Sequence, residues 1–511
     1  MTPHFKPARR LPVAMLLLLL VLPVLLVALA GCDLAPPYKA PQMVLPASYK
    51  GTGPFALAHP EAQLAQGDWW KMFGDEKLNG LEASLNAANP DLQAAEETYT
   101  QARDIVGEAR SQLFPQLSAQ TDAAQNRQSE NRLFRAGATG PNEEASIDYG
   151  AALTWEPDFW DEIRNRTNYA KSNAQATAAM VASARLSLEI ELANDYMALR
   201  ALDSEHAVYT KTLGYYGEAL KITQLRYSGK IAAGLDVERA QNQFSSAQAA
   251  DTDIEAQRAV LEHAIAVLAG DNPSTFSLPP EDLAHLAIPV IPAGVPSALL
   301  QRRPDIAQSE RRMAAENAAI GIARAAFYPN IKLSANAGFE SDGFGGLAAL
   351  SKSFWSIGAS AMLPLFEGGL RRAEEEQSQS EFAQAGDNYR STVLQAFREV
   401  EDQLVLTNKL ASEYSQQQDA LTSALKVQDL ALSLYTNGLD NYLNVTVAQV
   451  SALSSELATV QVRSRQLQAA VGLIGAVGGG WSTADQPTPK QTIPFNPLST
   501  HHSPGDVSEP N

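Results

Sequence analysis

Two long stretches without proline constrain the fold of this chain most strongly. Proline is absent from residues 158–272 and again from residues 365–486. Within them, residues 162–226 and 371–435 are rich in Ala, Glu, Gln, Leu and Arg, which favour or tolerate helix. Each helix would be roughly 100 Å long, because a helix rises about 1.5 Å per residue. That length does not fit a globular domain, and it is typical of a coiled-coil tube.

The chain is also a tandem repeat. Residues 89–117 resemble residues 303–331 at an offset of 214 residues, whereas Tyr227 and Tyr435 match at an offset of 208. One loop is therefore longer in the first copy, and we place it around residues 126–143. Each copy is predicted to run helix, strand, loop, strand, long helix, turn and return helix.

The shorter helices are predicted to stack end to end beside the long ones. Residues 235–269 would span roughly 50 Å and residues 297–327 about 45 Å, which together match one long helix. The same arithmetic holds more loosely for residues 443–477 with residues 78–113. The interruption falls midway, so residues 279–296 and the mature termini are expected to form an equatorial belt.

Four segments of about ten residues alternate in hydrophobicity with period two, the length and pattern of transmembrane β-strands. They are residues 117–123, 147–155, 331–339 and 355–363. A half-buried sheet in a soluble protein shows the same alternation. A lipid-facing sheet, however, leaves no open edge, and known barrels have about eight strands or more. Four strands per chain therefore require an oligomer of two or three chains if the sheet lies in a membrane.

The N-terminus has the pattern of an export signal. Positive residues within 6–10 precede an apolar run at residues 11–30, and small residues lead to Cys32, the single cysteine. A membrane-anchoring helix is the alternative. The tetrapeptide LAGC resembles a bacterial lipobox, which predicts removal of residues 1–31 and acylation of Cys32. Asp33 resembles an inner-membrane retention signal of some bacteria.

Charge and composition exclude several classes of function. A net charge of −18 disfavours nucleic acid and anionic membrane surfaces as partners. One cysteine permits no disulfide within the chain. We find no metal-ligand spacing, and His206 and His263 are expected to be solvated on helices. No nucleophile–base pairing or phosphate loop indicates an enzyme.

Six motifs carry a resemblance to a known family. They are GDWWKMFGDEKLNGL (67–81), LTWEPDFWDEIR (153–164), PSALLQRRPDI (296–306), LPLFEGGLRR (363–372), RYSGKIAAGLDVERAQ (226–241) and YTNGLDNYLNVTVAQ (435–449). In their order along the chain they resemble the outer-membrane efflux factor family, the TolC-like exit ducts, and within it the NodT-type lipoproteins. Pro157 departs from the pattern, since an apolar residue is more usual there.

The resemblance implies an α+β membrane protein. It would be a homotrimer whose twelve-stranded β-barrel, with four strands per chain, continues into a long α-helical coiled-coil periplasmic tunnel. Such a lipid-anchored outer-membrane channel passes drugs, other small toxic compounds or metal ions. It works with a periplasmic adaptor (membrane fusion) protein and an inner-membrane pump of the resistance-nodulation-division type. It needs no cofactor beyond the lipid on Cys32. The alternative is a periplasmic coiled-coil structural or adaptor lipoprotein without a barrel.

The expected organisation divides the chain into six segments. They are the signal peptide (1–31), the lipidated N-terminal segment and equatorial belt (32–77), the first repeat (78–270), the equatorial linker (271–296), the second repeat (297–480) and a disordered C-terminal tail (481–511).

The resemblance also implies a gate at the two periplasmic turns, where acids of related ducts form rings that narrow the tip. Asp236 lies in the first turn, and the repeat aligns it with Asn444 in the second, where Asp440 is the remaining acid. Three copies would create a constriction that favours cations. Alternatively, Asp236 caps the return helix.

Aromatic residues cluster at the ends of the predicted strands, where a membrane interface favours them. These residues are Trp155, Trp160, Phe354 and Trp355. Trp69 and Trp70 lie far from the strands in sequence, and we expect them to pack in the core of the equatorial belt.

Overall fold

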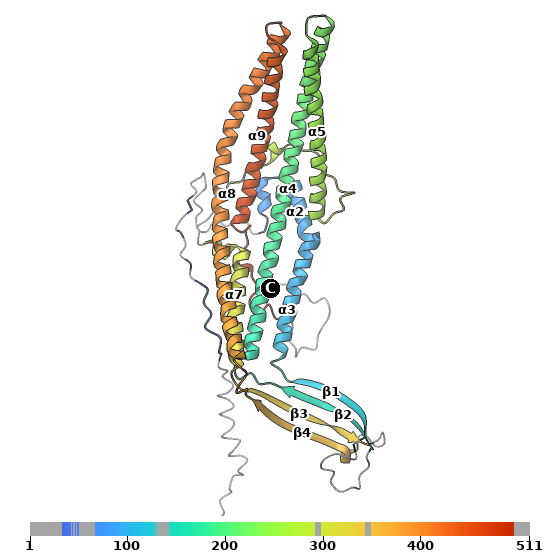
Figure 1. Cartoon of the computed structure of the whole chain (residues 1–511), viewed down its shortest axis with the longest axis vertical. Coiled ribbons are helices and arrows are strands. Elements are labelled where there is room, and N and C mark those ends of the chain that lie inside the picture. Colours follow the sequence, from blue (N-terminus) through green and yellow to red (C-terminus); the bar gives the residue numbers. More distant parts are fainter. Residues whose placement is uncertain are drawn as a thin grey trace, which may run out of the picture.

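The computed structural model describes residues 33–41, 43, 46, 49–50, 67–127, 129, 143–291, 298–342 and 349–494. The predicted signal peptide (1–31), Cys32 and residues 495–511 lie outside this part of the chain. Within it, a long helical section ends on a small β-sheet (Figure 1).

The repeat is visible in the element lengths. After the 3₁₀ helix η1 (Trp69–Phe73) and α2 (Glu76–Ala88), the first copy contains α3 (Pro90–Ser111), β1 (Gln116–Arg127), β2 (Glu143–Trp155), α4 (Glu162–Ser228) and α5 (Gly234–Leu268). After η2 (Leu283–His285) and α6 (Leu299–Arg302), the second contains α7 (Pro304–Ala325), β3 (Asn330–Ser341), η4 (Leu350–Lys352), β4 (Ser353–Met362), α8 (Leu370–Thr436) and α9 (Tyr442–Ala476). The α3 and α7 helices have 22 residues each, α4 and α8 have 67, and α5 and α9 have 35. The predicted order of elements is confirmed.

Local sequence explains where the short helices begin. Asn89 accepts a hydrogen bond from the backbone N–H of Leu92 and so caps α3, and Pro90 occupies the first helical position. Proline suits this position because its missing N–H would have no partner within the helix. The α7 helix also begins with a proline, Pro304, but its cap residue Arg303 makes no capping hydrogen bond with its side chain.

The short helices stack end to end, but in the other pairing from the one predicted. The end of α5 meets the start of α3, where the Asn89 side-chain amide donates to the carbonyl oxygen of Leu268 at 2.9 Å. The end of α9 meets the start of α7, where Arg303 Nη1 donates to the carbonyl oxygen of Ala476 at 3.0 Å. Figure 1 shows both columns. The predicted pairing is wrong because the four helices come in two matched lengths, so arithmetic on lengths does not distinguish partners.

Glycines permit the close approach at both junctions. A Cβ on Gly270 would lie 2.7 Å from the carbonyl oxygen of Ala88, and one on Gly478 would lie 2.0 Å from that of Arg302. Both glycines have positive φ, at 79° and 99°. A side chain at either position would therefore force the helix ends apart.

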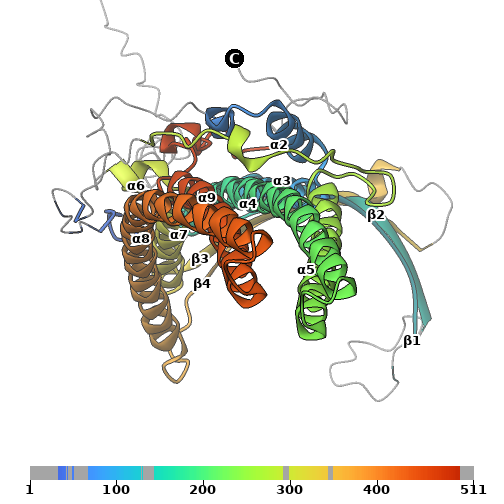
Figure 2. The same cartoon turned by 90° about the horizontal axis from the view of Figure 1, so that it is seen from above.

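The helices form one curved row. The α4 helix packs against the column of α5 and α3 and against the column of α9 and α7, and α8 packs on the far side of the second column. Seen along the helices, the row bends into an arc (Figure 2). The long helices span about 100 Å at 1.5 Å per residue. None of the helices in the described ranges combines the length and apolar character that a bilayer-spanning helix requires.

The largest apolar cluster lies at the equator, where the columns change helix. Trp69, Phe73 and Leu78 are fully buried there against α4 residues such as Tyr196. The rings of Trp69 and Trp70 meet edge to face with centroids 5.8 Å apart. The prediction that both tryptophans pack in the belt core is confirmed.

The sheet is an antiparallel meander in the order β1-β2-β3-β4. Leu117 pairs with Leu153, Ala151 with Ala337 and Leu333 with Ala359. The odd-numbered residues of all four strands therefore share one face, which we call the apolar face, and the even-numbered residues form the polar face. A slip of one residue in any pair would destroy this match.

Neither face of the sheet is covered by a helix of the described residues, and β1 and β4 each pair on one side only. Large apolar side chains stand in the open: Leu117 is 72% exposed, Trp355 75% and Ile357 79%. Such a surface requires a covering that a single chain does not supply.

The beginning of the C-terminal tail is ordered, contrary to prediction. Ser482 caps the 3₁₀ helix η5 (Thr483–Asp485), and the Gln175 side chain on α4 donates to the carbonyl oxygen of Pro487 at 2.8 Å. Ile493 packs against the α3–α4 contact at Val106. The prediction of a disordered tail is wrong for residues 481–494, because α3 and α4 bind this polar, proline-containing segment through both hydrogen bonds and apolar contacts.

Candidate functional site

The candidate site lies at the end of the helices farthest from the sheet (Figure 1). Here residues 229–233 connect α4 to α5, and residues 437–441 connect α8 to α9. We call these two turns and the adjoining helix ends the tip.

Both long helices end in the same way. The backbone N–H of Ile231 donates to the carbonyl oxygen of Arg226 at 2.8 Å, and that of Leu439 donates to Leu434 at 2.9 Å. Each bond spans five residues and requires a left-handed residue just before it. Gly438 supplies this at φ 76°, whereas Lys230 adopts φ 61° in the first turn. The tip geometry is thus set by backbone bonds that satisfy the last carbonyl groups of each helix.

Asp236 does not cap α5. The cap position is Ala233, without a side-chain hydrogen bond, and Asp236 lies in the first helical turn with its carboxylate 3.9 Å from Arg239. The alternative of a capping role is therefore wrong. Its negative charge is still favourable there, because a helix N-terminus carries partial positive charge.

Asp440 is held in a small network. Its carboxylate accepts two hydrogen bonds from the side-chain amide of Asn444, at 2.8 and 3.0 Å, and one from the backbone N–H of Asn441 at 2.7 Å. These bonds, that from Asn444 foremost, lower the pKa of Asp440 below its ordinary value. Asn441 caps α9 by accepting from the backbone N–H of Asn444 at 3.2 Å. Asn444 thus positions the acid, and Asn441 ends the turn.

An arginine that the sequence reading missed joins the two hairpins. Arg226 Nη1 donates to the carbonyl oxygens of Tyr435 at 2.8 Å and Thr436 at 3.3 Å. Its guanidinium lies 4.7 Å from the centre of the Tyr435 ring, which meets Tyr442 edge to face at 5.2 Å. The one available signal is that Arg226 adjoins Tyr227, the residue that the repeat aligns with Tyr435.

Apolar side chains are both buried and exposed at the tip. The buried group that joins the hairpins consists of Ala219, Ala240, Ala431, Tyr435, Tyr442, Val445 and Ala448. Beyond it, Ile231 is 71% exposed and Leu439 75% exposed on the two turns. The tip therefore presents apolar surface beside its acids.

The predicted interface aromatics do not share one face. Trp355 and Trp155 lie on the apolar face, and Trp160 stacks on Tyr328 at the junction of sheet and helices with ring centroids 4.7 Å apart. Phe354 lies on the polar face, where its ring contacts Gly338. Phe354 and Trp355 point to opposite faces because they are adjacent in the same strand. The membrane-interface role stays a prediction for all four residues.

Cys32 lies outside the described residues, but the residues directly after it contact α4 and α7. Asn165, near the start of α4, donates to Asp33 Oδ1 at 3.1 Å, and Asn317 on α7 donates to the carbonyl oxygen of Pro36 at 2.8 Å. Both contacts lie in the parts of α4 and α7 that are nearer the sheet. Asp33 thus lies near the sheet and not in the equatorial belt, so the prediction for the mature N-terminus is wrong.

His206 was predicted to be solvated. Instead its Nδ1 lies 2.7 Å from Asp251 Oδ1 on α5. Glu255 is the third member of this group. His263 is exposed on α5, in agreement with the prediction.

A helical section of this length on an uncovered sheet with one apolar face defines a subunit of a membrane channel. A family model described as "Outer membrane efflux protein" matches residues 83–271 and 295–479. The chain belongs to the outer membrane efflux protein family.

Relatives and solved structures agree. The antibiotic efflux pump outer membrane protein ArpC of Pseudomonas putida is 29% identical, over 91% of this chain and 96% of its own. The pyoverdine export outer membrane protein OpmQ of Pseudomonas aeruginosa is 30% identical, over 82% and 88%. The structure of the outer-membrane channel OprN superposes with a TM-score of 0.81 at 26% identity, over 88% of this chain and all of its own.

Proposed function

We propose that this chain is one subunit of the outer-membrane exit duct of a tripartite efflux pump. One observation carries the proposal: a single chain joins an uncovered sheet with one apolar face to helices about 100 Å long. The sheet suits a bilayer, and the helices are long enough to reach far into the periplasm. A duct with these two parts moves its substrate by diffusion and performs no covalent chemistry.

The duct is a homotrimer with a twelve-stranded barrel. Because the meander has an even number of strands, β1 and β4 run in opposite directions, and the free edge of one copy suits antiparallel pairing with the next. Lipid demands such closure, since an unpaired backbone amide there costs several kcal/mol. Two copies would give an eight-stranded barrel, whose interior is filled by side chains. Three copies give twelve and are the smallest number that leaves room for a lumen.

The two faces of the sheet suit this barrel. The apolar face carries residues such as Leu117, Leu333 and Ile357 toward lipid. The polar face carries Gln120 and Asn336 toward the lumen. The curvature of the helical row supports a tunnel built by three arcs (Figure 2).

The tip is the gate. Three-fold symmetry brings three copies of Asp236, Asp440 and Asn444 around one axis, and such a ring of carboxylates attracts cations. Arg226 links the two hairpins of each chain at this level, and we assign it the task of holding the tip narrow. Exposed Ile231 and Leu439 offer apolar surface for a periplasmic adaptor protein.

The remaining partners follow from the same proposal. The adaptor connects the duct to an inner-membrane pump of the resistance-nodulation-division type. The relatives named for antibiotic efflux and pyoverdine export support small, chemically diverse substrates, such as drugs, other toxic compounds or metal ions. The duct itself contributes little to the choice among them.

A lipid on Cys32 anchors the chain to the outer membrane. The contact with Asn165 holds Asp33 at the end of α4 that adjoins the sheet. That end meets the membrane surface in the proposed duct, so an acyl chain on Cys32 would reach lipid directly. The same contact gives Asp33 a use in the folded protein apart from any role in sorting.

Accumulation of a fluorescent pump substrate tests the proposal. Cells without this gene, but with its adaptor and pump, should retain ethidium, and the full-length gene should restore its loss from the cell. As a matched control, the cells receive the gene for the Asp122→Pro variant. A proline in the middle of β1 should prevent closure of the sheet. Equal ethidium loss with and without the gene, or full activity of the Asp122→Pro chain, would contradict an exit duct.

A further inference from the structure

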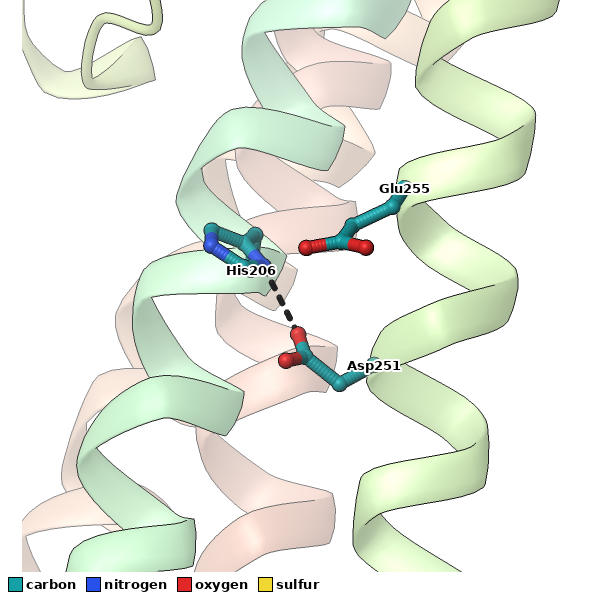
Figure 3. Close-up of side chains that lie close together, drawn as sticks. All are labelled: His206, Asp251 and Glu255. Carbon is teal, nitrogen blue, oxygen red and sulfur yellow. Dashed lines mark hydrogen bonds and ion pairs between the residues drawn. The ribbon is translucent and has the colours of Figure 1, made fainter.

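A group of three potential metal ligands lies between α4 and α5, away from the tip. His206 on α4 faces Asp251 and Glu255 on α5 (Figure 3), and one atom from each lies within 4.8 Å of the other two. His206 Nδ1 and Asp251 Oδ1 are 2.7 Å apart. The exit-duct proposal assigns no role to this group.

The acids come from one helix face. Asp251 and Glu255 are four residues apart on α5, so they are neighbours on its surface, and two negative charges at this spacing repel each other. Figure 3 shows both carboxylates directed toward the imidazole, with the single contact between Asp251 and His206. A cation between them would relieve the repulsion.

The second repeat shows what occupies the equivalent place. At the offset of 208 residues, His206 corresponds to Tyr414 and Glu255 to Arg463. There the guanidinium of Arg463 on α9 lies 5.8 Å from the centre of the Tyr414 ring on α8. The second hairpin thus holds its two helices together with a protein cation. In the first hairpin the position of Arg463 is taken by the anionic Glu255, which lies close to the imidazole of His206.

We propose that His206, Asp251 and Glu255 bind a divalent transition-metal ion of the zinc class, which joins α4 to α5 as Arg463 joins α9 to α8. One imidazole nitrogen and two carboxylates suit Zn²⁺ or Co²⁺, whereas Mg²⁺ and Ca²⁺ prefer oxygen ligands alone. Water completes the coordination. The ion replaces the His206–Asp251 hydrogen bond when it binds.

The distances permit this geometry. Metal–ligand bonds of about 2.1 Å in a tetrahedral site separate the ligand atoms by about 3.4 Å. The three atoms lie within 4.8 Å of one another, so closing the site requires movements of about 1–2 Å. The exposed Glu255 side chain can make such a movement by a change of rotamer.

The position of the site gives the ion a structural task. Asp251 lies 17 residues after Gly234, the first residue of α5, so the site is about 25 Å from the tip. An ion there stiffens the first hairpin midway between the tip and the equatorial belt. It would resist separation of α4 from α5 without touching the acids of the gate.

Calorimetric titration of the full-length protein tests the site. Untagged protein in detergent, freed of metal by chelation, should bind one Zn²⁺ per chain, and Co²⁺ should give the visible absorption of a tetrahedral ion. His206→Ala and the conservative Glu255→Gln should each weaken Zn²⁺ binding at least tenfold. His263→Ala, which removes an exposed histidine of α5, should leave Zn²⁺ binding unchanged. No binding by the parent chain, or equal binding by His206→Ala, would overturn the proposal.

An exchange between the repeats supplies a second readout. In the parent protein, Zn²⁺ should raise the melting temperature and a chelator should reverse the change, because a ligand that binds only the folded state stabilises it. The double variant His206→Tyr with Glu255→Arg copies the contact of the second hairpin. It should fold, and its melting temperature should not respond to Zn²⁺. A response equal to that of the parent would show that the ion binds elsewhere.

Discussion

Arg226, at the end of α4, donates a hydrogen bond of 2.8 Å from Nη1 to the backbone carbonyl oxygen of Tyr435, at the end of α8, and lies over the ring of the same residue. The contact joins elements 209 residues apart in the chain. Both partners lie at the tip, so the two hairpins of one subunit are coupled where the proposed duct is narrowest.

Removing this contact should loosen the tip. Arg226→Ala loses two charge-assisted hydrogen bonds and a cation–π contact, and in this partly exposed position the closed tip should lose about 1–2 kcal/mol. Planar-bilayer recordings should show larger or more frequent openings. Lys221→Ala, which removes the same charge from an exposed position on α4, serves as the control. Identical recordings from the two variants would mean that Arg226 does not restrain the tip.

The tip acids should set ion selectivity. Asp236→Ala combined with Asp440→Ala should reduce the preference for cations, because the ring loses six carboxylates in a trimer and salt screens charges only partly in a narrow pore. Since the pKa of Asp440 is lowered, its contribution should persist in moderately acidic solution. Reversal potentials in a salt gradient measure the effect.

A capping variant is the matched control for the tip acids. Asn441→Ala removes the cap of α9 and should cost about 1 kcal/mol of stability without changing selectivity. If the double aspartate variant keeps the parent selectivity, the acids are not part of a gate.

A buried acid at the equator should make stability depend on pH. Burial, and the nearby charge of Glu189, raise the pKa of Glu82 from 4.5 to about 10. The Glu82 carboxyl ionises near pH 4.5 in the unfolded chain but stays protonated up to about pH 10 in the folded chain. The free energy of unfolding therefore falls as pH rises between these two values. The slope from this group is at most about 1.4 kcal/mol per pH unit.

Glu82→Gln should remove that slope and stabilise the protein most at alkaline pH. Trp69, whose indole N–H donates to Glu189 at 3.1 Å, provides a fluorescence signal for thermal unfolding at this place. Glu76→Gln alters an exposed acid of the same helix and should change little. A parent protein whose melting temperature is constant from pH 5 to about 9 would be inconsistent with a buried, protonated Glu82.

Cys32→Ser should abolish lipid attachment but leave the barrel intact, because the strands and helices of the described chain are all built from residues well after Cys32. Labelling with radioactive palmitate should mark the parent and Asp33→Asn, and should not mark Cys32→Ser. The yield of the serine variant in the outer membrane should fall. Label on the serine variant would show that the lipid is carried elsewhere.

The main architecture could be predicted because it depends on local patterns. Proline-free stretches predict α4 and α8, and period-two alternation predicts the four strands. The pairing of odd-numbered with odd-numbered residues, such as Leu117 with Leu153, follows from the same alternation, since the other parity would mix polar and apolar residues.

Contacts between distant segments were less accessible. The stacking of α5 on α3 depends on Asn89 and on the close approach at Gly270, which no periodicity reveals. The ligand-like group at His206 draws on two helices, so sequence spacing does not identify it. The repeat did carry a usable signal, because the offset that aligns His206 with Tyr414 also aligns the anionic Glu255 with the cationic Arg463.

Three-fold closure of the sheet is the central claim, and single-particle imaging of the detergent-extracted, full-length protein tests it most directly. We expect three chains around one axial channel, with a helical section about 100 Å long and β1 of each chain paired to β4 of the next. A stable monomer, or a particle in which the edges of β1 and β4 remain unpaired, would contradict the account.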